Sequence, residues 1–203
     1  MNVRELAVAG AWEFTPKQHG DDRGLFLEWM QETTLTATIG HRFRLAQANH
    51  SISSRGTVRA VHYADVPPGQ AKYVYCPRGR ILDVVVDIRV GSPTFGRYDT
   101  VLLDEADRRA VYVAEGLGHG FVALEDDSAL TYLCSEPYNP GREHTVNALD
   151  PALALPWPTD LELLLSPRDR AAPTLAEAQE QGALPRYEDC QDYYQRLTGH
   201  TVG

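Results

Sequence analysis

Four polar side chains stand alone in apolar, strand-like segments, and their types are those that move protons. They are His62 in VRAVHYA, Lys72 in QAKYVY, His119 in GHGFVAL and Tyr132 in LTYLC. Each has an ordinary structural explanation by itself: a lysine stem can extend to solvent, and a buried histidine or tyrosine can bond one polar partner. Alternate positions on the strands of a β-barrel converge on one inner face, so together the four can share a cavity.

His62, Lys72 and Tyr132 form a set that can transfer protons next to a ketone. A neutral histidine can remove a proton at neutral pH, because free imidazole titrates at about pH 6.5. A fixed ammonium stabilises the enolate that forms, and a tyrosine on the other side of the substrate returns a proton to the opposite face. Since base and acid act on opposite faces, the carbon is inverted. The set predicts an epimerase that acts on a carbon α to a carbonyl group.

Metal binding is the competing interpretation of histidines in such a barrel, and the spacing of the residues disfavours it. Many jelly-roll proteins hold a metal with an H-x-H pair, but no ligand stands two residues from His62 in RAVHYADV. Asp65, the nearest carboxylate, is three positions away and therefore on the opposite side of a regular strand. Because Zn and Fe need three or four convergent ligands, we expect no metal and no cofactor.

The composition limits the partners that the protein can have. Its 203 residues carry a formal net charge of −9, whereas nucleic acids and anionic membranes reward clustered lysine and arginine. We therefore expect neither partner, although a local group of cations can still bind a small anionic ligand. No segment resembles a membrane span or a signal peptide, and the cysteines Cys76, Cys134 and Cys190 lack metal-type spacing. Reduced thiols and a cytoplasmic location are the expectation.

The elements that must position these residues are short strands, from about residue 58 to residue 134. The period of two is clearest in RILDVVVDIRV, where one face carries Leu82, Val84, Val86 and Ile88 and the other carries Asp83, Val85, Asp87 and Arg89. Turn signals such as PPG, PRG, GSPTFG and EDD separate the runs. Many short strands with such punctuation predict an antiparallel all-β fold, and a jelly roll is the form that protects its edges.

Beyond about residue 165 the sequence changes to a helical pattern. Thr174 and Glu177 form a capping box and Gly182 can end the helix, so APTLAEAQEQG predicts one helix. RYEDCQDYYQRL predicts a second, and the proline-rich DPALALPWP before them indicates an irregular connector. We predict one domain over residues 1–203, with a β core at about 10–165 and helical decoration at about 170–198.

The chain resembles the dTDP-4-dehydrorhamnose 3,5-epimerase family from about residue 10 to 185, most closely its members from antibiotic deoxysugar pathways. The motifs that carry the resemblance are DDRGLFLEW, AQANHSISSRGTVRAVHY, PPGQAKYV, GLGHGFVAL, YNPGREH and LLSPRDRAAPTLAEA. It implies a cupin-type jelly-roll barrel with an N-terminal strand extension and C-terminal helices. It also implies a homodimer that shares its sites across the interface and binds a dTDP-4-keto-6-deoxyhexose without a metal or cofactor.

The resemblance implies a role for each residue that matches a family motif. His62 matches the base, and Asp169 in SPRD matches the acidic group that orients it, as in other His–Asp pairs. Lys72 matches the stabiliser of the enolate, and Tyr132 matches the general acid. Contacts to the nucleotide sugar fall on Arg23, Glu28, Gln47, Asn49, Arg59, His119, Tyr138, Glu143 and Arg168. The arginines suit a diphosphate, since a planar guanidinium bonds phosphate oxygens in pairs, and the Arg23 region is expected to reach across the dimer.

The stretch around His62 departs from the family pattern. The family usually has a glycine where this chain has Ala60, which adds a methyl group and removes the freedom of glycine at positive φ. Strict alternation would also place Arg59 and His62 on opposite faces of the strand. Both can face one cavity only if the strand departs from regular alternation, so we expect a bulge or a bend between them.

The sequence leaves the regiospecificity and two alternative functions open. Relatives invert C3, C5 or both carbons, and Tyr138 in EPYNP is either a second tyrosine that influences this choice or an aromatic that packs its turn. One alternative is a 3,4-ketoisomerase on the same fold, which also needs a base beside a ketone but moves the carbonyl group. The other is a non-catalytic sugar-nucleotide-binding module, which would keep its ligand affinity and its function in a His62→Ala variant.

Overall fold

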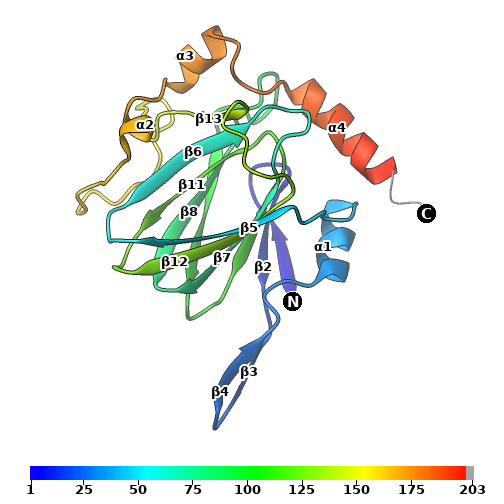
Figure 1. The fold of residues 1–203 in the computed structure, drawn as a ribbon, viewed down its shortest axis with the longest axis vertical. Coiled ribbons are helices and arrows are strands. Elements are labelled where there is room, and N and C mark those ends of the chain that lie inside the picture. The colour runs from blue at the N-terminus through cyan, green and yellow to red at the C-terminus, as the bar shows by residue number, and fades with distance from the viewer. Residues whose placement is uncertain (200–203) are drawn as a thin grey trace.

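Two antiparallel β-sheets form the body of the computed structural model, which describes residues 1–199 (Figure 1). The six-stranded sheet has the order β1-β2-β10-β7-β12-β5, with strands at Asn2–Glu5, Ala11–Thr15, Ala110–Val113, Lys72–Arg78, Ser128–Cys134 and Gln47–Ser53. The five-stranded sheet has the order β13-β6-β11-β8-β9, with strands at Glu143–Thr145, Val58–Ala64, Gly118–Ala123, Arg80–Val86 and Tyr98–Asp104. The all-β prediction is confirmed.

Apolar side chains of both sheets pack together between them. On β8, Ile81 and Val85 join this inner cluster, whereas Val84 and Val86 join a second cluster on the outer face, as the alternation predicts. The inner cluster also contains Val74, Val111 and Leu130 of the six-stranded sheet and Leu103 and Phe121 of the five-stranded sheet. The outer cluster packs the five-stranded sheet against the C-terminal segment through Leu153, Leu175 and Ala178. This sheet is therefore buried on both faces.

The two sheets remain separate, so the jelly roll is an open sandwich. No ladder of backbone hydrogen bonds joins them within residues 1–199, and each sheet keeps its own edge strands. Sheets that pack face to face lie about 10 Å apart because side chains interdigitate between them, and this exceeds the reach of a backbone hydrogen bond. The jelly-roll prediction is confirmed, with the correction that the sheets do not close into a continuous barrel.

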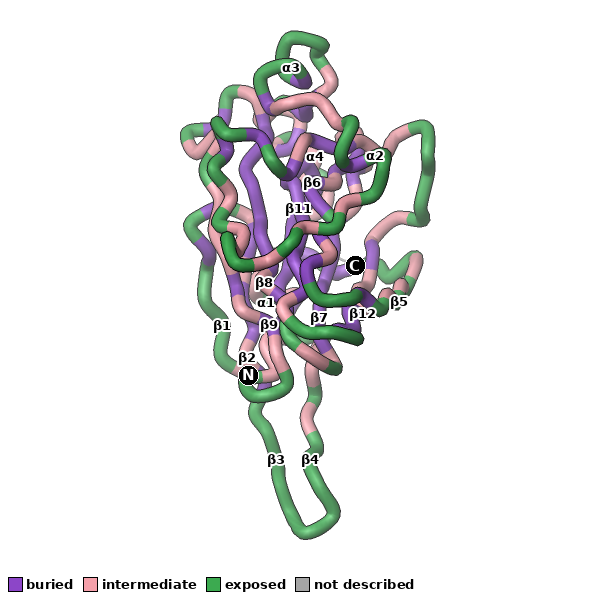
Figure 2. Tube along the Cα trace, turned by 90° about the vertical axis from the view of Figure 1, so that its left-hand side faces the viewer, coloured by how far each residue is buried: buried purple, intermediate pink, exposed green. Residues whose placement is uncertain are grey.

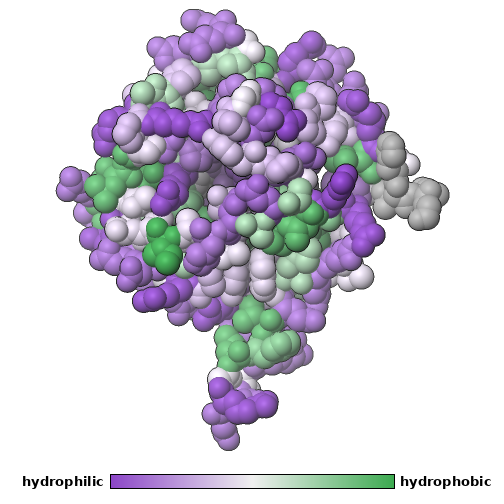
Figure 3. All heavy atoms as spheres, in the orientation of Figure 1, coloured by the Kyte–Doolittle hydropathy of each residue, from purple (hydrophilic) through white to green (hydrophobic). Residues whose placement is uncertain are grey.

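A hairpin of β3 (Gln18–Asp21) and β4 (Gly24–Leu27) projects from one end of the sandwich (Figure 1). Figure 2 shows that this arm, residues 18–27, is exposed along nearly its whole length. Its large apolar side chains include Leu25 and Phe26, which are 47% and 66% exposed. Figure 3 shows hydrophobic atoms gathered along the arm above a hydrophilic tip. The N-terminal strand extension is present, and most of its surface is left uncovered by the rest of the described chain.

Helices lie outside the sandwich, and residues 1–199 contain α1 (Glu32–Ile39), α2 (Pro167–Arg170), α3 (Leu175–Glu180) and α4 (Tyr187–Gly199). The capping box of α3 is confirmed, because Thr174 Oγ1 accepts the Glu177 N–H and the Glu177 carboxylate accepts the Thr174 N–H. Helix α4 confirms the second predicted helix. The sequence does not predict α1, ETTLTATI, because its threonines are β-branched and typical of strands. None of the described helices has the length and apolar character that a membrane span requires.

Candidate active site

A polar cavity opens between the two sheets and takes its walls from both. It consists of two adjoining hollows of about 180 Å³ each, which share His62, Lys72 and Tyr132. His62 lies on β6 of the five-stranded sheet, whereas Lys72 on β7 and Tyr132 on β12 belong to the six-stranded sheet. The structure thus brings the three predicted proton-transfer residues into one cavity. The other lining residues are Gln47, Asn49, Ser51, Arg59, Gln70, His119, Phe121, Leu130, Tyr138, Glu143, His144 and Arg168.

A β-bulge in β6 brings Arg59 and His62 to the same cavity. On the neighbouring strand β11, His119 pairs with His62 and Phe121 pairs with Arg59. Because a step of three residues on β6 matches a step of two on β11, one residue of β6 is left over. The expected bulge is confirmed. Arg59 lines the same hollow as His62 and donates from Nε to Ser53 Oγ at 3.2 Å.

Ala60 fits at the bulge because the residue that faces it is a glycine. A β-carbon built on Gly120 would lie 2.1 Å from the β-carbon of Ala60, which is closer than two carbons can approach. Ala60 is not among the described residues with positive φ, so it needs none of the conformational freedom of glycine. The methyl group that departs from the family pattern is thus accommodated by the missing side chain of Gly120.

His62 is held by Asp169, which lies 107 residues further along the chain. The His62 Nε2 is 2.8 Å from Asp169 Oδ1, and the two side chains are 34% and 6% exposed. The short helix α2 places the carboxylate, because Pro167 starts the helix and Ser166 Oγ accepts the Asp169 N–H at 3.1 Å. Burial acts to raise the pKa of Asp169, but the hydrogen bond and the charge of His62 hold it below its ordinary value. The carboxylate stays ionised and fixes the orientation of the imidazole.

Lys72 places an ammonium group in the cavity although the residue is only 8% exposed. In the described part of the chain, this ammonium has no hydrogen bond or ion pair. Burial lowers the pKa of Lys72, and electrostatic interactions with Cys134, Glu143 and Asp83 oppose the shift. An ammonium without a partner in the protein can give its N–H groups to a ligand oxygen.

Tyr132 offers a protonated phenol on the wall that faces β6. Burial raises the pKa of Tyr132 above its ordinary value, and the hydrogen bond with Asn49 opposes the shift in part. Two amides extend this contact along β5, since Gln47 Nε2 donates to Asn49 Oδ1 at 2.8 Å. Gln47 Oε1 accepts the Tyr138 N–H at 2.9 Å, so the same amides connect β12 to the turn that carries Tyr138. The Tyr138 ring is 54% exposed and lines the cavity.

The other predicted contacts within this chain also gather at the cavity. Glu143 and Arg168 line the hollow that contains His62, and Arg168 Nη2 donates to the Glu143 carbonyl oxygen at 2.8 Å. His119 lines the adjoining hollow, and its Nε2 lies 2.7 Å from Oδ2 of the fully buried Asp83. Arg168 and Arg59 therefore supply two guanidinium groups at one cavity, which is the chemistry that binds phosphate oxygens.

Arg23 and Glu28 are not brought to the cavity of their own chain. Arg23 lies at the turn of the arm and pairs with Asp21, and Glu28 follows the arm and accepts a hydrogen bond from Gln31 at 2.6 Å. Neither residue lines either hollow. That the Arg23 region reaches the site of a second copy stays a prediction, for which the projecting arm is the element available.

Sequence reasoning misses five residues that line the cavity: Ser51, Gln70, Phe121, Leu130 and His144. Gln70 Nε2 donates to Glu143 Oε1 at 3.3 Å, and it stands two positions before Lys72, so alternation along the chain could have identified it. His144 Nε2 lies 2.7 Å from Asp65 Oδ1, and its ring packs on Tyr63. No local signal identifies this residue, because its partner is 79 positions away.

Histidines near the cavity bond aspartates rather than one another. Within residues 1–199, no three His, Cys, Asp or Glu side chains lie close enough together to hold a metal ion. The pairs are His62 with Asp169, His119 with Asp83, and His144 with Asp65. An ionised aspartate accepts one ring N–H and leaves the other ring nitrogen to meet a ligand. Each aspartate therefore fixes the orientation of one imidazole ring near the cavity.

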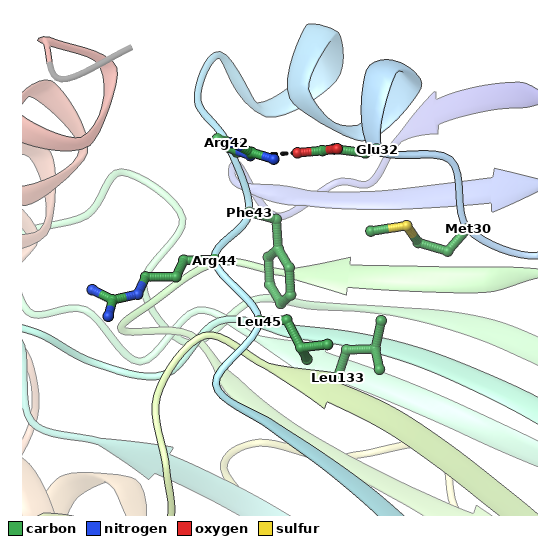
Figure 4. Close-up of a pocket in the computed structure, with 7 residues that line it drawn as sticks. All are labelled: Met30, Glu32, Arg42, Phe43, Arg44, Leu45 and Leu133. Carbon is green, nitrogen blue, oxygen red and sulfur yellow. Dashed lines mark hydrogen bonds and ion pairs between the residues drawn. The ribbon is translucent and has the colours of Figure 1, made fainter. Parts of the chain in front are cut away.

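A more spacious hollow lies elsewhere and lacks proton-transfer groups (Figure 4). Its volume is about 570 Å³, and it is lined by Met30, Glu32, Arg42, Phe43, Arg44, Leu45 and Leu133. Glu32 is already paired with Arg42, and Arg44 points away from the apolar side chains. Because its one carboxylate is engaged and it contains no histidine or tyrosine, the smaller polar cavity is the candidate active site.

Comparison with known proteins identifies the family. The family model described as dTDP-4-dehydrorhamnose 3,5-epimerase matches residues 5–177. A dTDP-4-dehydrorhamnose 3,5-epimerase of Mycolicibacterium smegmatis is 56% identical over 202 residues, which cover 100% of both chains. The solved structure of the rmlC epimerase of Mycobacterium tuberculosis is similar with a TM-score of 0.95 and 53% identity, covering 97% of this chain and 100% of that chain.

ChmJ of Streptomyces bikiniensis, a 3'-monoepimerase solved in complex with dTDP-quinovose, is similar with a TM-score of 0.93 and 50% identity. The match covers 95% of this chain and 98% of ChmJ. These relatives extend over nearly the whole chain, and the range of the family model contains the arm, the strands from β2 to β13 and the helices α1 and α2. The chain therefore belongs to the dTDP-4-dehydrorhamnose 3,5-epimerase family, a family of isomerases that act on carbohydrates.

Proposed function

We propose that the protein epimerises a dTDP-4-keto-6-deoxyhexose at carbon next to the C4 ketone, with His62 as base and Tyr132 as acid. The observation that carries the proposal is that these two groups line one cavity from facing sheets, with the Lys72 ammonium in the same cavity. Membership of the family supports the class of reaction, and the geometry of the cavity supports the roles we assign.

The reaction begins when His62 removes the proton from the carbon beside the ketone. Asp169 is ionised, and its Oδ1 accepts the Nε2–H of His62, so Nδ1 of His62 carries the free lone pair towards the substrate. The aspartate also stabilises the imidazolium that forms, as in other His–Asp pairs. The Ser166 cap holds the carboxylate in place while this happens.

The electrons of the broken C–H bond move onto the C4 oxygen and give an enolate. Lys72 donates N–H groups to this oxygen, because its ammonium has no competing bond within residues 1–199. A buried ammonium interacts more strongly with an oxyanion than an ammonium in water does, since the local dielectric constant is low. Lys72 thus stabilises the charge that develops in the transition state.

Tyr132 completes the inversion by giving its phenolic proton to the same carbon from the other face. Its raised pKa keeps the phenol protonated until the enolate forms, and nearby Arg59 favours the phenolate that remains. Solvent then returns a proton to the phenolate and takes one from the imidazolium, which restores both groups. The substrate lies between β6 and β12 in this arrangement.

The nucleotide diphosphate is assigned to Arg59 and Arg168, with Arg23 from a second copy of the chain. The arm leaves Leu25 and Phe26 exposed. The free energy falls when another protein surface covers such apolar side chains. A homodimer in which each arm reaches the other cavity would cover them and would complete the site with Arg23. The exposed arm supports this part of the proposal.

The carbon assigned to inversion is C3. One relative is named a 3,5-epimerase and another a 3'-monoepimerase, so C3 is the carbon that both names include. Whether C5 also reacts depends on whether the sugar ring can turn in the cavity so that C5 also meets His62. Tyr138, on its exposed turn at the cavity, is the residue we assign to that choice.

Proton NMR of dTDP-4-keto-6-deoxyglucose incubated with the protein in D2O tests the function. We expect the H3 signal to disappear as deuterium enters, and disappearance of H5 would extend the reaction to C5. Retention of both signals over many enzyme equivalents would overturn the proposal. A product with its carbonyl at C3 would instead show a 3,4-ketoisomerase, and unchanged function in His62→Ala would show a binding module.

A further inference from the structure

Cys134 lies directly beside two residues that line the cavity, at a point where three strands meet. Its strand β12 runs between β5 and β7, and Cys134 pairs with Gln47 on one side and with Lys72 on the other. It stands two positions after Tyr132 and therefore shares its face. The side chain is fully buried, and Asn49 Nδ2 donates to its Sγ at 3.6 Å. The thiol thus lies among the amide, the ammonium and the phenol of the site.

The thiol of Cys134 differs chemically from the hydroxyl group that a serine would place at the same position. Burial raises the pKa of Cys134 to about 11 although Lys72 opposes the shift, so the thiol is uncharged at neutral pH. Sulfur is a weak hydrogen-bond acceptor, whereas a serine oxygen accepts readily from an ammonium. Directly paired residues on one face of a sheet have β-carbons about 5 Å apart, within reach of such a bond.

The other charged and titratable groups that face Lys72 are engaged elsewhere or do not accept from it. Glu143 on β13 and Asp83 on β8 act on it electrostatically, but neither forms an ion pair with it within residues 1–199. Glu143 bonds Gln70, and Asp83 bonds His119 through Oδ2 while its Oδ1 has no partner in the described chain. The remaining groups that line the same hollows are Arg59, His62, His119, Tyr132, Tyr138, His144 and Arg168. Lys72 pairs directly with Val113 on β10 and with Cys134 on β12, and Cys134 is the partner beside Tyr132 and Asn49, where an acceptor would capture the ammonium.

We propose that Cys134 is a positioning residue: its sulfur lies beside Lys72 without accepting the hydrogen bonds of the ammonium, which leaves those protons for a substrate oxygen. The inference rests on the proposed function, in which Lys72 stabilises the enolate. It predicts an unusual order of variants. Cys134→Ser, nearly equal in size, harms the reaction more than the smaller Cys134→Ala, whereas a merely structural role gives the reverse order.

The two lysines of the chain make the test direct. Lys17 and Lys72 are its only lysines, so lysine labelled with 13C at the ε carbon gives one NMR signal from the cavity and one from exposed Lys17 as reference. The titration midpoint of Lys72 is measured in the wild-type protein and in Cys134→Ser and Cys134→Ala. Cys76→Ser is the matched control, because Cys76 is equally buried on β7 and bonds the Arg78 carbonyl. The titration requires no turnover, so it stays informative if the proposed reaction fails.

The serine variant should raise the Lys72 midpoint by about one pH unit, because a hydrogen bond to the charged form favours that form. Its kcat should fall on the order of tenfold with little change in KM, whereas the alanine variant should lose about threefold and keep its midpoint at or below the wild-type value. Cys76→Ser should move neither quantity.

Equal Lys72 midpoints in the serine and alanine variants would overturn the inference, and so would a serine variant that is more active than the alanine variant. If circular dichroism shows that Cys134→Ser does not fold, Cys134→Ala carries the test. A raised Lys72 midpoint in that variant, or a loss of kcat beyond about tenfold, then contradicts the role assigned to the sulfur.

Discussion

The two walls of the cavity differ in how their polar groups are paired. On the five-stranded sheet every cavity histidine bonds an aspartate, through His62 on β6, His119 on β11 and His144 on β13. On the six-stranded sheet, Lys72 and Tyr132 bond no carboxylate within the described chain, and their neighbours are amides and a thiol. One wall holds each of its imidazoles with a carboxylate, and the other leaves an ammonium and a phenol without one among residues 1–199.

The two groups proposed to act on the substrate from these walls, His62 and Lys72, also differ in burial. The His62 side chain is 34% exposed, whereas Lys72 is 8% exposed. A base oriented by a carboxylate keeps its position and basicity near water, but an ammonium stabilises an oxyanion best where water does not screen it. In the proposed mechanism, the five-stranded wall orients the base, and the six-stranded wall stabilises the charge of the enolate.

The largest effect should follow from removing the base. His62→Asn should lower kcat on the order of 10³-fold, because a general base contributes about 10²–10⁴-fold, and should leave the affinity for dTDP within about threefold. Steady-state kinetics and calorimetric titration with dTDP measure the two quantities. His144→Asn is the matched control, since His144 also bonds an aspartate on the same wall, and it should cost less than about tenfold. Equal losses in both variants would break the comparison.

Lys72→Met should lower kcat by about 10²-fold, since it removes the donor to the enolate but keeps the length of the side chain. Wild-type activity should also fall at alkaline pH. Burial lowers the pKa of Lys72, so the ammonium is lost as pH rises through a range below that of free lysine. Tyr132 has a raised pKa and keeps its proton through that range.

Lys72→Arg separates these two groups, because arginine stays charged at every accessible pH. The variant should keep its remaining activity to higher pH than the wild-type protein, in a profile of kcat/KM between pH 6 and 10.5. An alkaline limb at the same pH in both proteins would assign that limb to another group and would weaken the role of the six-stranded wall.

Gly120→Ala should destabilise the wall that carries His62, because the new β-carbon would lie 2.1 Å from that of Ala60. Overpacking of this kind costs about 1–3 kcal/mol, which lowers Tm by roughly 2–4 °C per kcal/mol in a protein of this size. The double variant Ala60→Gly with Gly120→Ala should recover most of the loss, since it moves the methyl group to the other strand. Differential scanning calorimetry measures both, and a double variant no more stable than Gly120→Ala would contradict the contact.

Arg23→Ala should have the smallest effect, because the arm belongs to neither wall. If Arg23 contacts the diphosphate of a second copy, dTDP should bind about tenfold more weakly, and kcat should change little. Arg44→Ala is a suitable control, since Arg44 is exposed at the separate hollow of Figure 4. An unchanged Kd for dTDP in Arg23→Ala would remove the arm from the site.

Features that depend on neighbours in sequence are predictable here. The alternation in β8, the capping box of Thr174 and Glu177, and the two C-terminal helices follow from local patterns. The bulge in β6 is predictable as well, because Arg59 and His62 have opposite parity and only an extra residue brings both to one face.

Features that depend on the order of strands are not predictable from one sequence. Asp83 meets His119 because β8 lies beside β11, and Asp65 meets His144 because β13 lies beside the end of β6. Asp65 illustrates the limit: by sequence it is the carboxylate nearest to His62, yet in the fold it serves another histidine. The separation of the sheets likewise arises from side chains that meet only in the folded chain.

The central claim is that a base and an acid act from the two facing walls. It is tested most directly with the variant Tyr132→Phe, which is incubated with the keto-sugar nucleotide in D2O while NMR follows C3. If His62 deprotonates from one face and Tyr132 reprotonates from the other, the variant should still exchange H3 for deuterium, because His62 and Lys72 remain. The deuterium should then return on the face from which the proton left, so the recovered sugar keeps its configuration. Inversion at an undiminished rate, or no exchange at all, would contradict an acid and a base acting from facing sheets.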